Sequence, residues 1–109
     1  MSEQALVNDV IAYIFSIGGW AMRVNSGTQV IKGELGTRVF RGAPKGTADV
    51  IGCLSNGRFI AVECKIGSNT CSLEQTIFLD RIKEAGGLAF ACWDNIDAVI
   101  SEVQKAGIV

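Results

Sequence analysis

Two runs of apolar and β-branched residues, Ala48 to Leu54 and Arg58 to Ile66, follow each other with only Ser55-Asn56-Gly57 between them. Such runs predict neighbouring antiparallel strands, because the glycine can adopt the left-handed backbone that a tight connection needs. The remaining segments must therefore pack around a central hairpin. Glu63 and Lys65 lie two positions apart in the second run, so they point to the same face of that strand.

The length of the connection decides whether Asp49 joins these two residues. A two-residue turn at Asn56-Gly57 would pair Asp49 with Cys64, whereas a three-residue loop would pair it with Glu63. We predict the three-residue loop or another odd count. Asp49, Glu63 and Lys65 would then share one face of the sheet.

Two carboxylates on adjacent strands form a hard-oxygen site that suits Mg²⁺, which polarises a phosphate and lowers the pKa of bound water. Carboxylates about 4 Å apart repel by roughly 4 kcal/mol at an effective dielectric constant near 20, so the pair is costly without a cation. The chain contains no histidine, which leaves carboxylates and carbonyls as the expected metal ligands. The alternative is an exposed Glu/Lys pair at a sheet edge.

The flanking segments supply two further candidates. Ser2 can cap a first helix that carries Leu6, Val7, Val10, Ile11, Ile14 and Phe15 at helical spacing, and the same spacing places Glu3 on the inner stripe. Ser72-Leu73-Glu74-Gln75 is a capping-box pattern that opens a second helix, and Gln75 can also face inward.

Strands are predicted at residues 20–25 and 88–93, a loop or loose hairpin at residues 26–47, and a last helix that ends near Ala106 and is capped by Asp94 or Asn95. The order is α, β, β, β, α, β, α, an α/β fold with a mixed sheet flanked by helices. Residues 1–109 are expected to form a single domain, since 49% of them are hydrophobic and only one is proline.

Composition also bounds the location and the partners. No apolar stretch approaches the roughly 20 residues of a membrane span, so we expect a cytoplasmic protein without a membrane partner. The four cysteines lack CxxC spacing, which favours core packing over zinc binding or a disulfide. Residues 23–45 carry five basic side chains and only Glu34 as an acid, a charge of +4, which leaves −5 for the rest of a chain whose total is −1. A basic lobe beside an acidic cluster fits phosphate binding, although solvated surface charge is the alternative.

The spacing from Asp49 to Glu63 and Lys65 matches the PD-(D/E)XK nuclease signature, and the whole chain resembles the VRR-NUC branch of these nucleases, with Ala48 where the signature has proline. The segments that carry the resemblance are the helical Glu3, Arg23-Val24-Asn25-Ser26-Gly27, Gly46-Thr47-Ala48-Asp49-Val50-Ile51-Gly52, Arg58-Phe59-Ile60-Ala61-Val62-Glu63-Cys64-Lys65, Ser72-Leu73-Glu74-Gln75 and Ala85-Gly86-Gly87. The resemblance implies a restriction-endonuclease-like αβββαβ core.

It also implies roles for individual residues. Asp49 and Glu63 would bind Mg²⁺ or Mn²⁺ with the carbonyl of Cys64, and Lys65 would be the catalytic lysine. Glu3 would bind the metal or its water shell, and Gln75 would support the lysine or the attacking water. The residues expected to contact DNA are Arg23, Asn25, Ser26, Lys32, Arg38, Arg41 and Lys45.

Stand-alone members of this branch resemble four-way-junction (Holliday junction) resolvases, which implies a metal-dependent, structure-selective DNA endonuclease in a bacterial cell or a phage-infected host. Symmetric cutting needs two active sites, so a homodimer is expected. A flap nuclease, an exonuclease or a restriction-type nuclease of the same fold is an alternative. A non-catalytic DNA-binding module is the alternative from another functional class.

Overall fold

A computed structural model describes the backbone of residues 1–109 and every side chain except that of Gln29. The elements, in chain order, are α1 (Glu3–Ser16), β1 (Trp20–Arg23), β2 (Thr28–Gly33), β3 (Gly36–Arg41), β4 (Val50–Cys53), β5 (Phe59–Lys65), α2 (Leu73–Glu84), β6 (Leu88–Trp93) and α3 (Asp97–Lys105). None of the helices in the part of the chain described combines the length and the apolar character needed to cross a membrane.

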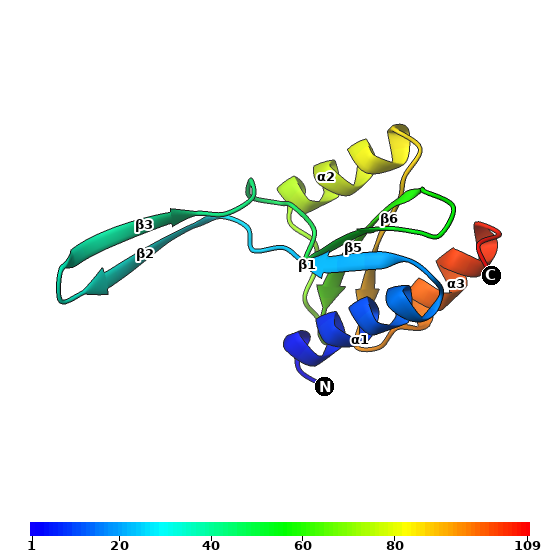
Figure 1. The fold of residues 1–109 in the computed structure, drawn as a ribbon, viewed down its shortest axis with the longest axis horizontal. Helices are drawn as coiled ribbons and strands as arrows, with labels where there is room; N and C mark the ends of the chain where they lie inside the picture. Colours follow the sequence, from blue (N-terminus) through cyan, green and yellow to red (C-terminus); the bar gives the residue numbers. More distant parts are fainter.

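The central sheet has the strand order β1-β4-β5-β6. β4 is antiparallel to both of its neighbours, whereas β5 and β6 are parallel because α2 connects them. Helices lie on both sides of the sheet, with α2 on one face and α1 and α3 on the other (Figure 1). The predicted mixed α/β fold with an αβββαβ core is therefore confirmed. We call these elements the body.

The larger core lies between the sheet and the helices α1 and α3. Leu6, Val7, Val10 and Ile14 are fully buried on α1, as their spacing predicts, and each contributes about 1.5–3 kcal/mol through burial. Phe15 was expected on the same stripe but is 49% exposed. Ile14, one residue earlier in the same turn, is fully buried, so Phe15 lies at the edge of the covered stripe. Of the cysteines predicted to pack in the core, Cys64 and Cys92 are buried and Cys53 is exposed, and all four are free thiols.

The connection between β4 and β5 has the predicted length. The backbone N–H of Leu54 donates to the carbonyl of Arg58 over 2.8 Å, which leaves Ser55-Asn56-Gly57 as a three-residue loop. Gly57 adopts the left-handed conformation, with φ 86°. Val50 pairs with Val62, so one further step of the same register places Asp49 opposite Glu63.

Residues 26–47 were expected to be a loop or a loose hairpin, and they contain a regular one. β2 and β3 pair along their whole length and form a separate two-stranded sheet. We call this hairpin, Thr28–Arg41, the arm, and it projects far beyond the body (Figure 1). The first strand of the body ends at Arg23, two residues earlier than predicted, because the chain then turns into the arm.

The last helix has a different start from the one predicted. Ile96, and neither Asp94 nor Asn95, is its N-cap residue. Asn95 nevertheless accepts a hydrogen bond from the first helical N–H, that of Asp97, over 2.9 Å. A side-chain oxygen therefore satisfies one of the free donors at this helix end, although from one position earlier than a standard cap.

Candidate active site

Asp49, Glu63 and Lys65 lie at one end of the central sheet, on the face that α2 covers. Asp49 directly precedes β4, and its Oδ2 accepts a hydrogen bond of 2.9 Å from the backbone N–H of Cys64. This bond fixes the carboxylate beside the strand that carries Glu63. The predicted convergence of positions 49, 63 and 65 is therefore present in the structure.

Glu63 is almost completely buried, with 3% of its surface exposed. Burial and the neighbouring Asp49 carboxylate raise the pKa of Glu63 to about 8, and the charge of Glu3 adds to the rise. Lys65 acts in the opposite direction, because its Nζ lies 3.7 Å from Oε1 of Glu63. Without a bound cation, the ionised form of Glu63 is therefore disfavoured.

Gln75, in the first turn of α2, links the two charged residues of β5. Its Nε2 donates to Oε1 of Glu63 over 2.9 Å, and its Oε1 accepts from Nζ of Lys65 over 3.0 Å. The same Oε1 accepts from the backbone N–H of Ser72 over 2.8 Å, which completes the capping box. The capping role and the inward-facing role predicted for Gln75 are thus both present. The first turn of α2 therefore caps the helix and also orients Lys65.

Gly46 brings the segment before Asp49 against the start of α2. It is buried with φ +94°, and a Cβ at this position would lie 2.7 Å from the backbone of Glu74. Any other residue would push the two segments apart. The adjacent Lys45 pairs with Glu74 at 3.6 Å across the same contact. The approach of Asp49 to the site is therefore fixed from the α2 side as well.

The donor set fits a hard divalent cation. Oε2 of Glu63 is buried and has no hydrogen-bond partner among the described residues. A buried carboxylate oxygen without a partner is costly, and a second carboxylate beside it increases the cost. A cation such as Mg²⁺ would satisfy this oxygen and favour the ionised form of Glu63. Asp49 and Glu63 are the side chains placed to bind it.

Glu3 is exposed at the first residue of α1, one helical turn before the fully buried Leu6 and Val7. Its charge nevertheless contributes to the raised pKa of Glu63, so the carboxylate lies within electrostatic reach of the candidate site. Among the side chains described, no group of three or more acidic or cysteine residues is arranged to hold a metal ion. A contact of Glu3 with the water shell of a metal stays a prediction.

The residues expected to bind DNA fall into two groups. Arg23 ends β1 and donates a hydrogen bond to Gln4 in α1. Asn25 and Ser26 lie where the chain enters the arm, and the backbone carbonyl of Asn25 accepts from the N–H of Ala43 over 2.9 Å. The others are exposed, on the arm or just after it: Lys32, Arg38, Arg41 and Lys45. The structure thus places Lys32 and Arg38 on the arm, away from the carboxylates (Figure 1), whereas Lys45 lies against the start of α2.

One solved structure similar to this chain is that of Hjc, a Holliday junction resolvase from the archaeal hyperthermophile Archaeoglobus fulgidus. The TM-score is 0.50 at 16% sequence identity, and the similarity covers 83% of this chain and 67% of the resolvase. No protein-family model and no curated protein matches the sequence. The structural similarity supports the fold, and membership of the VRR-NUC family stays a prediction.

Proposed function

We propose that this chain is a metal-dependent DNA endonuclease that hydrolyses phosphodiester bonds in branched DNA, as a resolvase does. The observation that carries the proposal is the convergence of Asp49, Glu63, Lys65 and Gln75 at one end of the sheet, with one buried carboxylate oxygen left without a partner. Such a set is costly for the fold in the absence of a ligand. The similarity to Hjc supports the resolvase class.

In this mechanism Asp49 and Glu63 would hold Mg²⁺, or Mn²⁺ in its place, and the carbonyl of Cys64 would contribute a further ligand. When bound, the cation polarises the scissile phosphate and lowers the pKa of the attacking water. Lys65 donates hydrogen bonds to that water or to the phosphate oxygens, and so stabilises the charge that develops in the transition state. Gln75 keeps the lysine in place, because its Oε1 accepts from Nζ. The oxygen of the water bonds to phosphorus and its proton passes to solvent, while the bond to the leaving sugar oxygen breaks and that oxygen takes up a proton from solvent.

Two cuts on opposing strands require two sites, so we propose a C₂ homodimer as the active species. Light scattering with and without junction DNA tests this part separately. A protein that stays monomeric in both conditions would exclude symmetric resolution but not single-strand cleavage.

The experiment that tests the activity compares wild type with Lys65→Met on labelled four-way-junction, flap, duplex and single-stranded DNA, with Mg²⁺, Mn²⁺ or EDTA. We expect the wild type to cleave the junction when either cation is present, and we expect no product with EDTA or with the variant. Equal products from both proteins would point to a contaminating nuclease. DNA binding by the wild type without cleavage on any substrate would favour the non-catalytic module.

A further inference from the structure

The arm exposes apolar side chains that the body does not cover. Leu35 at its tip is 98% exposed, and four further apolar residues of the two strands, Val30, Ile31, Val39 and Phe40, are between 48% and 60% exposed. A two-stranded hairpin is at best marginally stable in water by itself. The arm reaches far enough from the body to give the molecule a long axis of 51 Å against 30 and 28 Å. These properties are those of an element that packs against a partner.

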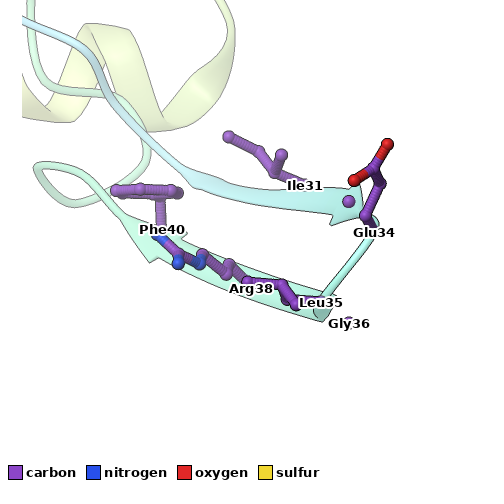
Figure 2. A pocket seen from close by; sticks show the side chains of 7 residues that line it. Ile31, Glu34, Leu35, Gly36, Arg38 and Phe40 are labelled. Carbon is purple, nitrogen blue, oxygen red and sulfur yellow. The ribbon is translucent and has the colours of Figure 1, made fainter.

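One face of the arm forms a groove. Ile31 pairs with Arg38, so their side chains share a face, and Phe40 lies two residues further along the same face. Figure 2 shows Ile31 and Phe40 rising from the same side of the hairpin, with Leu35 at its tip. They line a hollow of about 530 Å³. A second hollow of about 300 Å³ shares Ile31 and Phe40 and continues to Asn25 at the base of the arm. The groove therefore runs from the tip towards the body.

Basic side chains lie on both faces of the arm. Arg38 is on the groove face, whereas Lys32 and Arg41 are on the opposite face, since they pair with Thr37 and Thr28. A partner protein would normally meet one apolar face. Positive charge on both faces of a narrow β-ribbon instead fits a position between the two phosphate backbones of DNA. The major groove of DNA, about 12 Å wide, admits a two-stranded ribbon. The charge of +4 over residues 23–45 favours the same partner.

The arm also starts at the end of the sheet that carries the candidate active site. Its two connections leave after Arg23 and return before Asp49, next to the candidate active site. DNA bound with a phosphate at Asp49 and Glu63 therefore passes the base of the arm. Apolar side chains gain little from an intact duplex, whose bases are stacked and paired. They gain more where helices separate and base faces become accessible.

We propose that the arm is the element that selects branched DNA: its basic residues contact phosphates on both sides, and Leu35, Ile31 and Phe40 pack against bases exposed at the branch point. The inference rests on the proposed function, because it assumes that DNA is the substrate. It assigns to the three apolar residues a role in choosing the substrate and none in the hydrolysis.

Binding measurements test this without depending on cleavage. All variants carry Lys65→Met, and the titrations use a four-way junction with 2-aminopurine at the branch point and a linear duplex of equal length. For Leu35→Ser and Phe40→Ser we expect the junction Kd to rise about ten-fold or more and the duplex Kd to stay within about three-fold of the wild-type value. The increase in 2-aminopurine fluorescence that is expected when the arm binds the branch point should be lost in both variants. Phe15→Ser is the control, since Phe15 is an aromatic residue of the body with a similar exposed fraction, 49% against 54%.

Leu35 is nearly fully exposed in the turn, so its replacement leaves the packing of the body unchanged. An unchanged preference for the junction in Leu35→Ser and Phe40→Ser would overturn the proposal. So would a loss of dimer in sedimentation with the DNA preference intact, which would assign the groove to a second copy of the chain. Failure of the wild type to cleave any DNA would instead count against the proposed function, and the binding preference would still be measured.

Discussion

The body and the arm of this molecule are stabilised in different ways. In the body, a buried core and two hydrogen bonds fix the side chains that converge on Glu63. Gln75 donates to the carboxylate of Glu63, and the backbone N–H of Cys64 donates to that of Asp49. In the arm, every side chain of β3 is exposed, and the strands pair only with each other. Packing therefore positions the chemical groups, while the arm contributes charge and apolar surface at a distance. This difference predicts that rate and substrate binding can be altered separately.

The largest effect is expected from Lys65, the lysine of the candidate active site. In the proposed mechanism Lys65→Met removes a hydrogen-bond donor to the scissile phosphate, and kcat should fall on the order of 100- to 1,000-fold with little change in KM. Lys32→Met is the matched variant on the arm, where the lysine is exposed, and it should raise KM and leave kcat unchanged. Steady-state cleavage of a labelled junction measures both constants. A fall in kcat for both variants would contradict the separation of the two regions.

The next effect concerns the pH dependence of stability. The pKa of Glu63 is raised from 4.5 to about 8 by burial and by Asp49, so its contribution to stability is complete below pH 4.5 and is lost as the pH rises through 8. Between pH 5 and pH 9 the metal-free protein should lose on the order of a few kcal/mol through this residue. Glu63→Gln removes the ionisation and should raise the melting temperature at pH 9 by about 5–10 °C.

Thermal unfolding in EDTA at both pH values measures this effect, and Glu102→Gln on the exposed side of α3 is the control. Mg²⁺ should restore the stability of the wild type at pH 9 and leave Glu63→Gln nearly unaffected. A wild type whose melting temperature does not respond to Mg²⁺ would argue against a cation between Asp49 and Glu63.

A smaller effect is expected from Gln75, which joins the helix cap to the site. Gln75→Leu leaves Oε1 of Glu63 and the N–H of Ser72 without their partner, and it should cost about 1–2 kcal/mol of unfolding free energy. Cleavage should fall about ten-fold, because the lysine is then free to move. Urea unfolding and single-turnover cleavage measure the two effects. Thr76→Ala in the same turn should change stability slightly and cleavage not at all.

The smallest change in stability is expected in the arm. The double variant Lys32→Gln/Arg38→Gln should change the unfolding free energy by less than about 0.5 kcal/mol, since both side chains are exposed. The dependence of log Kd on log salt should nevertheless become shallower by about 1.8, the value for two lost phosphate contacts. DNA binding from 50 to 200 mM salt tests this, and an unchanged slope would place the arm outside the DNA interface.

The sequence predicted the site better than it predicted the arm, and the reason is physical. The register of β4 against β5 follows from a three-residue loop and the alternation of side chains, both of which are local. Gln75 could be predicted as a site residue because a capping box has a recognisable sequence pattern. The arm has no buried face to produce an alternating pattern. Phe15 follows the helical period of α1 but is half exposed beside the buried Ile14, because the width of the covered stripe around a helix is a tertiary property.

The chain enters and leaves the arm at neighbouring points. The N–H of Gly42 donates to the carbonyl of Gly27 over 2.9 Å, and Gly42 has no room for a Cβ, which would lie 2.3 Å from the carbonyl oxygen of Asn25. A hairpin of another length or composition could therefore be grafted between these two glycines without altering the spacing from Arg23 to Asp49. The length of the arm is thus independent of the geometry at its base, where the two connecting segments are held side by side.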